Sequence, residues 1–582
     1  MVSTTSTIAP ALLSLFQNPL DLGFVSRILV VGDGSVGRDP VTPFDWTRMI
    51  AAIRGYTHRL GSFEVDLAHR GPYDRVSSSP EPAFKFLNFR FDASVNGKRV
   101  IDSYDQIWLF GFEPGNGKPP DDAEIMKPGR NPLSDSELFA LSSWMNAGGG
   151  VFATGDHFFM GASMCSRVPR VNKMRRWTIA QGVPNSNIGD TSEPFKRVDT
   201  NRPEKYGSLE PPNFPPYLGS NFWDYYIRDE ENQQDATPQD IEWTRYLMGV
   251  LPDDSPFPWD FAAYMPHPLL CHPLHGPIDV MPDHSHEGMC FGPDEFDTSD
   301  GHFPEFAGIK PIPEVVAYGK TLRTPPYYFE IGLQKRRPPF PMIVAYDGQM
   351  ITLGRVVVDS TWHHWFDYNL VGLKGVNLDK VERYFVNVAI WLASPRWRQW
   401  DLYGEVVAAH MGYYGYQTFN PRASAYANGR SFIQRSARTL GRCWIVSILT
   451  EDILRTFNPQ LYTGIREHFR SGGMPGIDRG VLSFETFEAA IAGGIVKQVY
   501  ARLDPIREEY RHYGSWPATI SKGELEEDLR LGIAHGLNEI SQSYYRELRR
   551  SSGLMDIVRD ASRKGNEEFE SKYSRVLNAT KN

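Results

Sequence analysis

Apolar and polar positions alternate along the first 400 residues in a pattern that predicts strands separated by helices. The predicted strands are short runs of β-branched and aromatic residues bounded by glycine or polar residues, and they lie at 27–34, 63–67, 104–112, 149–155, 314–318, 342–346 and 354–359. Apolar residues spaced three and four apart predict helices at 44–60, 134–148 and 378–392. This alternation favours an α/β fold whose mostly parallel sheet is covered on both faces.

Two of these helices carry end signals. Ser134-Asp135-Ser136-Glu137 reads as a capping box, and Gly148 can supply the left-handed residue that stops the same helix. Pro395 is expected to end the unit that the helix at 378–392 closes.

Two regions depart from the alternation. From about 167 to 313 the chain is dominated by Pro, Asn, Asp, Gly and His, which is typical of a long functional insertion or lid. Residues 399–582 look mostly helical, with helices expected near 430–456, 484–502, 523–548 and 553–578. We therefore predict an α/β domain at 1–398, with an irregular His-rich insertion at about 167–313, and a helical domain at 399–582.

Composition narrows the class of protein. The 582 residues are 41% hydrophobic and 23% charged, as in an ordinary globular protein, and no stretch reaches the roughly 20 apolar residues of a membrane-spanning helix. We therefore expect no membrane partner. The four cysteines are widely scattered and fit no disulfide framework or zinc knuckle, so a cytoplasmic location is expected; they are Cys165, Cys271, Cys290 and Cys443.

Charge is uneven along the chain. Residues 1–400 hold 37 basic and 48 acidic residues, and residues 401–582 hold 24 and 22, which together give the net charge of -9. An acidic first part does not attract nucleic acid, so no nucleic-acid partner is expected. Nineteen of the 24 basic residues in the second part are Arg, and they could serve an interface or a solvated helical surface.

Candidate chemistry is concentrated in histidines. Nine of the fifteen histidines lie in three stretches, at 154–157, 267–302 and 359–364. The first and third stretches directly follow predicted strands, where an open α/β sheet presents side chains to a ligand.

The predicted elements also resemble a known fold. The strands at 28–31 and 105–110, the helix ending in Gly148-Gly149-Gly150, the strand and turn at 151–157, and the segments at 354–358 and 387–392 resemble the flavodoxin-like, class I glutamine amidotransferase-like superfamily. Within it, the chain is most similar to the ThuA-like (trehalose-utilisation) branch. The resemblance covers roughly 250 residues, is more specific for fold than for reaction, and leaves the C-terminal part unassigned.

One departure from this superfamily matters for chemistry. Its glutaminases carry a nucleophilic cysteine on the turn after the strand equivalent to 151–154, but here that turn reads Gly155-Asp156-His157, and the nearest cysteine is Cys165. We therefore do not expect glutamine hydrolysis through a thioester.

The resemblance implies that the turns after the strands at 151–154 and 354–359 lie side by side. Imidazole and carboxylate groups brought together there could hold zinc or another divalent metal, or act without metal as a His–Asp general base. The alternative is structural, with Asp156 capping a helix and the histidines being ordinary pocket residues. The candidate catalytic residues are Asp156, His157, Asp359, His363 and His364, and the candidate metal ligands are His157, His284, His286 and His363.

A further set of residues is predicted to contact substrate. Gly32-Asp33-Gly34-Ser35-Val36-Gly37 matches the dinucleotide pattern GxGxxG, although a tight turn that shapes a cleft is the favoured interpretation. Basic residues that follow the turn at 155–157 could form an anion-binding rim, or else a solvated helix face. The candidates for substrate contact are Asp33, Ser35, Arg167, Arg170, Trp362 and Glu287, and Lys173, Arg175 and Arg176 extend the rim.

The leading hypothesis is an enzyme with a His/Asp site, metal-dependent or metal-free, that hydrolyses or rearranges a small polar substrate. A carbohydrate derivative is the favoured class. The alternative is a catalytically inactive amidotransferase-like protein whose helical domain at 399–582 mediates assembly as a homo-oligomer or with a protein partner. Use of a nucleotide through residues 32–37 is a third possibility.

Overall fold

The structure is a computed structural model. It describes residues 24–34, 36, 45–56, 61–71, 84–113, 132–156, 160–178, 181, 239–250, 262–282, 288–319, 340–370, 373–410, 420, 422–455, 462, 484–513, 519–543 and 546.

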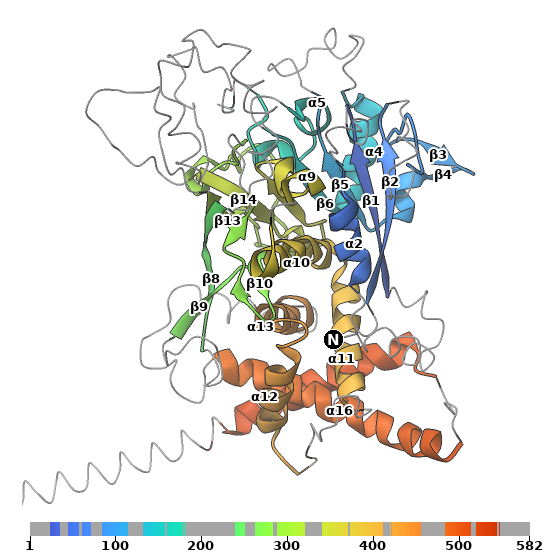
Figure 1. Cartoon of the computed structure of the whole chain (residues 1–582). Coiled ribbons are helices and arrows are strands. Elements are labelled where there is room, and N and C mark those ends of the chain that lie inside the picture. Colours follow the sequence, from blue (N-terminus) through green and yellow to red (C-terminus); the bar gives the residue numbers. More distant parts are fainter. Residues whose placement is uncertain are drawn as a thin grey trace, which may run out of the picture.

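A nine-stranded sheet forms the centre of the described structure (Figure 1). In spatial order its strands are β12 (Val280–Met281), β7 (Gln239–Trp243), β13 (Glu314–Gly319), β14 (Phe340–Tyr346), β15 (Val356–Asp359), β6 (Gly150–Thr154), β5 (Gln106–Phe110), β1 (Val25–Gly32) and β2 (Ser62–His69). β15, β6, β5, β1 and β2 pair in parallel, and the other pairs are antiparallel. Only β14 and β7 run against the other strands of this sheet, so the predicted α/β class with a mostly parallel, mixed sheet is confirmed.

The order of the parallel strands fixes where a ligand is expected. From β2 through β1, β5 and β6 to β15, the strands follow the flavodoxin-like order, in which the chain reverses direction across the sheet between the first and third strands. That switch point lies between β1 and β5. Open α/β sheets bind ligands outside the carboxyl ends of the strands around this point.

Alternating side chains divide the interior into two hydrophobic layers. Successive strand residues point to opposite faces, so Val30, Phe110 and Phe152 face one cluster while Val31 and Leu109 face the other. The first layer is covered by α2 (Thr47–Gly55) and α10 (Gly375–Leu392), and the second by α4 (Asp135–Asn146) and α5 (Ala162–Cys165).

The end signals of α4 are those read from the sequence. Ser134 is the N-cap, and it and Glu137 exchange the reciprocal hydrogen bonds of a capping box. Gly148 follows the helix with a φ of 105°, a conformation that favours glycine. The predicted start and stop of this helix are confirmed.

The region predicted as an irregular insertion contributes strands to the sheet. β7 and β12 come from it and extend the sheet beyond β13. It also forms two small antiparallel pairs, β8 (Arg245–Val250) with β9 (Ala262–Pro266), and β10 (Cys271–His272) with β11 (Gly276–Pro277). A third hairpin, β3 (Ser94–Val95) with β4 (Lys98–Arg99), lies before β5.

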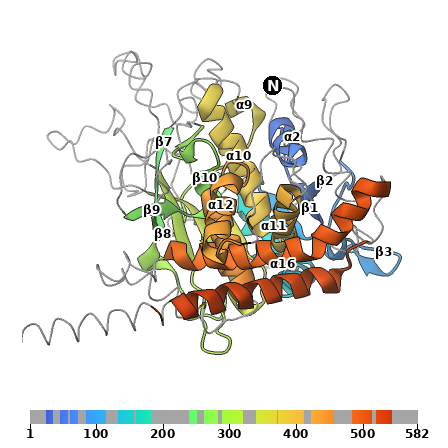
Figure 2. The ribbon, with the colours of Figure 1, turned by 90° about the horizontal axis from the view of Figure 1, so that it is seen from below.

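Helices of the C-terminal part lie at the amino ends of the parallel strands (Figures 1 and 2). They are α11 (Pro395–His410), α12 (Ala425–Ser436), α13 (Arg442–Ser447), the π-helix η10 (Ile448–Leu454), α16 (Phe484–Tyr513) and a helix at 522–543. The helices predicted near 484–502 and 523–548 are confirmed in outline, whereas the one predicted near 430–456 is divided into the end of α12, α13 and η10 by a break at 437–441. The one predicted at 553–578 lies outside the described residues. The helix predicted at 378–392 ends at Leu392, three residues before Pro395 as expected, and Pro395 itself begins α11. The predicted boundary at 398 falls inside α11, and the division into two domains stays a prediction.

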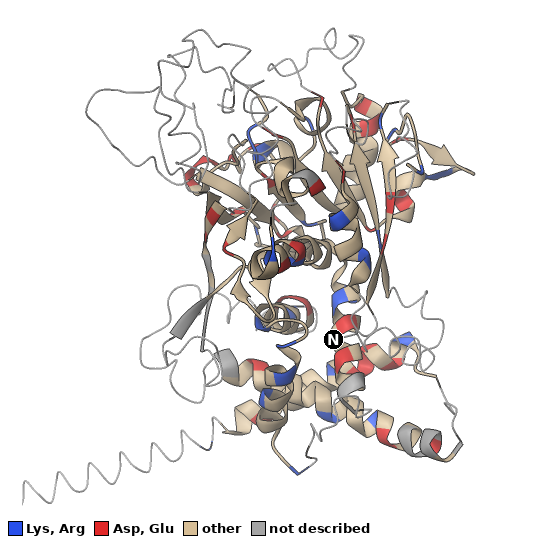
Figure 3. Ribbon diagram, in the orientation of Figure 1, with Lys and Arg blue, Asp and Glu red and all other residues tan. Residues whose placement is uncertain are grey.

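Buried ion pairs join these helices to the sheet. Arg355, which directly precedes β15, pairs with Asp347 at 2.9 Å. Arg398 of α11 binds both carboxylate oxygens of Asp452 at 2.6 Å, and Arg455 reaches Asp347 at 3.2 Å. Figure 3 shows basic residues in the first turns of α11, where Arg398 makes its pair beside the sheet, and acidic residues in the later turns.

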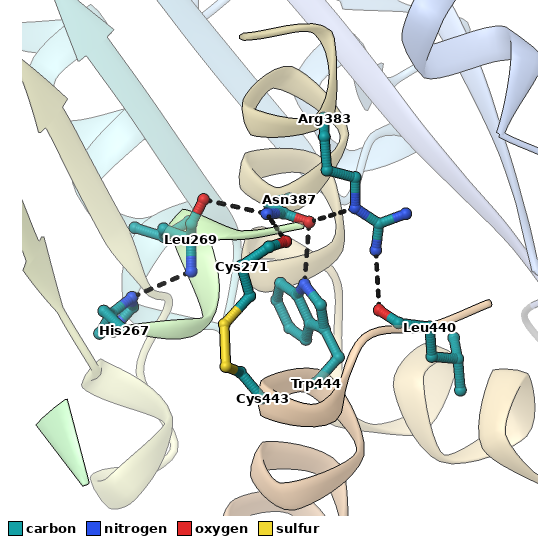
Figure 4. The surroundings of a disulfide bond; sticks show 8 residues. All are labelled: His267, Leu269, Cys271, Arg383, Asn387, Leu440, Cys443 and Trp444. Carbon is teal, nitrogen blue, oxygen red and sulfur yellow. Dashed lines mark hydrogen bonds between the residues drawn. A yellow bond between two sulfur atoms is a disulfide. The ribbon is translucent and has the colours of Figure 1, made fainter. Parts of the chain in front are cut away.

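A disulfide makes a second connection (Figure 4). Cys271 of β10 is bonded to Cys443 of α13, across 172 residues of chain. Beside it, the buried Asn387 of α10 donates to the carbonyl oxygens of Leu269 and Cys271 and accepts from Trp444 Nε1 at 2.9 Å. The prediction that the cysteines fit no disulfide framework is wrong for this pair. A cytoplasmic location stays a prediction.

Among the helices described, none combines the length and the apolar character needed to cross a membrane.

Candidate functional site

The two turns predicted to share a site do lie side by side. β6 and β15 are parallel neighbours, with Thr154 paired to Asp359 at their carboxyl ends. The chain leaving β6 then contacts the chain leaving β15, since Trp362 N donates to Gly155 O at 2.8 Å. This sheet adjacency places Asp156 next to the η9 turn (Trp362–His364).

Asp156 and His363 form the central pair of the site. The Nε2 atom of His363 lies 3.5 Å from Oδ2 of Asp156, and both side chains are almost fully buried. On the other side of the ring, Nδ1 lies 2.8 Å from Asn369 Oδ1, at the base of α9 (Asp367–Leu370). An amide oxygen accepts hydrogen bonds, so this contact suits a proton on Nδ1, and Nε2 is the ring nitrogen nearest the carboxylate.

Thr361 holds both members of this pair. Its hydroxyl donates to Asp156 Oδ1 at 2.8 Å and accepts from the backbone N–H of His363 at 3.1 Å. One short side chain therefore fixes the carboxylate and the start of the η9 turn relative to each other.

Asp359 and His364 form a second pair that lies in the core. His364 Nδ1 lies 2.8 Å from Asp359 Oδ1, and Asp359 Oδ2 accepts from Trp365 Nε1 at 3.0 Å and Tyr384 OH at 3.1 Å. Both residues of the pair are fully buried. Both oxygens of the Asp359 carboxylate already have hydrogen-bond partners in the protein, so this pair is better suited to holding the η9 turn in place than to binding a substrate. A catalytic role for either residue stays a prediction.

Asp33 lies at the switch point, as the fold leads one to expect. Its Oδ1 atom accepts from the backbone N–H groups of Phe112 and Glu113, which follow β5, at 2.6 and 3.0 Å. Burial raises the pKa of Asp33, and those two hydrogen bonds oppose the shift. Gly34 has a φ of 64°, consistent with the tight turn favoured for the GxGxxG segment.

The Trp362 ring is packed rather than open. It stacks on Phe112 with ring centroids 4.2 Å apart and an angle of 14° between the rings. One face of the indole is thereby occupied by the segment that also holds Asp33. Trp362 lies beside the His363 ring, and one face of its indole is covered by Phe112. Stacking of a sugar on the other face stays a prediction.

The described basic residues of the proposed rim are bonded to other parts of the protein, and a rim that binds substrate stays a prediction. Arg167 bonds Leu133 O and Asp135 at the start of α4, while the buried Arg170 bonds Asn146 at the end of α4, toward the amino ends of the strands. Arg176 is paired with Glu295, and Arg175 is fully buried. Arg170 in particular is turned away from Asp156, so the structure does not bring it to the site.

Several predicted site residues lie outside the described residues. They are Ser35, His157, His284, His286 and Glu287. In the part of the chain that is described, no group of three or more His, Cys, Asp and Glu side chains is placed to hold a metal ion. Of the predicted metal ligands, only His363 can be placed, with Asp156 as its neighbouring oxygen donor.

Two residues of the site were missed in the sequence. Thr361 lay inside the motif at 359–364, where its spacing from Asp156 gave no signal. Asn369 follows six residues after His363, and its role depends on how the chain turns into α9. Only the fold shows either contact.

Comparison with known proteins adds no assignment. No family model and no curated protein matches the sequence. Among solved structures, a cytoplasmic protein from Salmonella typhimurium is similar at 10% sequence identity, over 63% of this chain and 98% of that chain, with a TM-score of 0.23. This likeness carries no argument about fold or function.

Proposed function

We propose that the chain is an enzyme in which His363 and Asp156 perform proton transfer on a small polar substrate, by hydrolysis or rearrangement. The observation that carries the proposal is the 3.5 Å approach of His363 Nε2 to Asp156 Oδ2 at the carboxyl edge of a flavodoxin-like sheet. Ligand sites of such sheets lie at this edge.

Each group has a defined task in this proposal. His363 Nε2 takes a proton from the attacking or rearranging group, and Asp156 stabilises the imidazolium that results. The imidazolium then returns the proton to the leaving or rearranged group, which restores the neutral base. Asn369 holds Nδ1, so that Nε2 is the nitrogen that reacts. Asp33, whose carboxyl group is buried nearby in the fold, is proposed to contact substrate hydroxyl groups when it is protonated.

The substrate class rests on the resemblance to the ThuA-like branch, which favours carbohydrate derivatives. A glutaminase-type thioester route is not proposed, because the turn where those enzymes carry their cysteine reads Gly155-Asp156-His157 in this chain. A divalent metal such as zinc would need His157, His284 or His286 beside His363, and it would supply Lewis-acid and hydroxide chemistry.

The first experiment is a screen of the full chain with sugar lactones, acylated sugars and sugar amides, with turnover followed by product analysis, alongside elemental analysis for bound metal. His363→Gln and Asp156→Asn are expected to reduce the turnover found by about 10²- to 10⁴-fold, the usual contribution of general acid–base catalysis. His535→Gln, an exposed histidine of the helix at 522–543, is the matched control and should leave turnover unchanged.

Unchanged turnover in both His363→Gln and Asp156→Asn would overturn the proposal. Stoichiometric metal that is lost in His363→Gln would favour the metal-dependent form over the metal-free one. No turnover with any compound, together with a stable oligomer of the full chain by light scattering, would instead favour the assembly role of residues 399–582.

A further inference from the structure

Arg175 lies between the two turns that carry the site. Its backbone pairs with Cys290 in an isolated β-bridge, and its side chain has no exposed surface. A buried guanidinium is costly unless its N–H groups are bonded. The hydrogen-bond partners of Arg175 therefore indicate the role of this buried group.

The hydrogen bonds of Arg175 all go to backbone carbonyl oxygens. Nη2 donates to Asp156 O at 2.8 Å and to Ser360 O at 2.7 Å, and Nε donates to Asp359 O at 3.0 Å. Nη1 donates to Arg176 O at 3.1 Å. One nitrogen, Nη2, thus joins the turn after β6 to the turn after β15.

An aromatic ring and two glycines pack closely around the guanidinium group of Arg175. Its central carbon lies 4.2 Å from the ring centre of Trp177. A Cβ atom added to Gly288 would lie 2.2 Å from Nη2 and 2.4 Å from Ser360 O, and one added to Gly155 would lie 2.8 Å from the Trp177 ring. Glycine at both positions therefore allows the close approach of the two turns to the guanidinium.

The charge also suits this position. Burial lowers the pKa of Arg175, and the neighbouring Cys290 and Asp156 groups oppose that shift. Arginine stays protonated in proteins, and its planar fork bonds several acceptors in fixed directions, which an ammonium group cannot do.

We propose that Arg175 is a positioning residue that sets the distance between Asp156 and His363 by clamping the carbonyl groups of Asp156, Asp359 and Ser360. The inference rests on the proposed function, in which that pair transfers the proton. Arg175 does not touch the reacting atoms in this role; it acts through the two turns.

The test is amide hydrogen exchange in the full-length Arg175→Lys variant. Trp362 N–H reports the contact between the two turns, because it donates to Gly155 O. Its exchange is expected to accelerate about 10- to 100-fold, through local opening of the turns, while the amide of Val30 in the centre of β1 keeps its rate. The matched control is Arg398→Lys, an equally buried arginine at the opposite edge of the sheet, which should not accelerate Trp362 more than Val30.

Gly288→Ala gives an independent variant that keeps the charge. Its new Cβ would displace both the guanidinium tip and Ser360 O, the carbonyl that the guanidinium bonds, so Trp362 should again exchange faster than Val30. Gly523→Ala, where nothing lies within 4 Å of the added atom, is the glycine control and should change neither amide. If Trp362 keeps its rate, or accelerates only in step with Val30, in both Arg175→Lys and Gly288→Ala, then Arg175 does not position the turns.

Turnover separates this inference from the proposed function. Once a substrate is found, Arg175→Lys should lower kcat by about 10- to 100-fold while KM changes far less, because a misplaced catalytic group affects chemistry more than binding. A normal kcat in Arg175→Lys with a large loss in His363→Gln would overturn the positioning role alone. Normal turnover in His363→Gln would overturn the proposed function, whereas the exchange experiment needs no substrate.

Discussion

The sheet and the C-terminal helices fill their interiors in different ways. Between the sheet and α10, aromatic side chains interlock: the Trp365 ring lies 4.4 Å from Phe152, 4.8 Å from Phe385 and 5.6 Å from Trp108. Between α12, α16 and the helix at 522–543, backbone packs on backbone. A Cβ added to Gly429 or Gly493 would lie 1.6 or 1.7 Å from a carbonyl oxygen of the facing helix.

This difference predicts opposite sensitivities. A core filled by large side chains loses stability when atoms are removed, because a cavity remains. A contact made by glycines loses stability when atoms are added, because the helices must separate. The buried ion pairs and the disulfide lie between the two regions. Here we expect stability to depend on charge pairing and on a covalent link.

The largest effect is expected at the ion pairs between the regions. Asp452→Ala would leave the fully buried Arg398 without its carboxylate partner, whereas Arg355, 3.9 Å from Asp452, would keep its closer pair with Asp347. Breaking one side of a buried ion pair costs about 3–5 kcal/mol, to be measured as the free energy of unfolding in urea. Glu527→Gln, in an exposed pair with Arg530, should change it by less than about 1 kcal/mol. Equal effects of the two variants would contradict a structural role for the buried pairs.

The disulfide should give the next largest effect. Cys443→Ala removes a link across 172 residues, and losing such a bond costs about 2–4 kcal/mol. Reductant should destabilise the natural chain by a similar amount and leave the variant unchanged. If reductant lowers the stability of both equally, the loss does not come from this bond.

The sequence predicted the sheet region better than the contacts between regions. Periodicity identified β1, β6 and β15, and the capping box identified α4, because these signals lie within a few residues of each other. The adjacency of Asp156 and the η9 turn followed once the strand order was expected from the resemblance.

Contacts made by single side chains across the fold could not be predicted in this way. Arg175 is one of five basic residues between 167 and 176, a cluster that suggests a rim or a solvated helix face, but its bonds depend on where the turns after β6 and β15 meet. Proline both follows helix ends and occupies the first position of helices, so Pro395 indicates the end of α10 but does not show that α11 begins there. The pairing of Cys271 with Cys443 cannot be predicted from the sequence, since no spacing rule links residues 172 positions apart.

A pH effect is expected at the border of the sheet region. His267 lies edge-on to Tyr246 and Trp391, and burial lowers its pKa from 6.5 to about 4. The unfolded chain therefore takes up a proton near pH 6.5 and the folded chain only near pH 4. Stability is present above pH 6.5 and is lost as pH falls toward 4, by up to about 3 kcal/mol.

The measurement for this prediction is urea unfolding between pH 7 and 4. The His267→Asn variant keeps an acceptor for the N–H of Leu269, but asparagine does not titrate between pH 7 and 4. The stability of this variant should therefore fall less steeply as pH is lowered. Equal slopes in the variant and the natural chain would show that another group causes the loss.

The smallest effect, and the sharpest test of the comparison, is expected at the glycine contact. Gly493→Ala adds one methyl group against Ala425 O and should cost about 1–3 kcal/mol through separation of α12 and α16. Gly523→Ala adds the same group with nothing within 4 Å and should be neutral or stabilise by less than about 1 kcal/mol, because alanine favours helix.

Hydrogen exchange should show faster opening in α12 and α16 than in β1 for Gly493→Ala. If Gly493→Ala is as harmless as Gly523→Ala, the helices can shift to admit a methyl group, and the proposed contrast with the aromatic packing of the sheet fails.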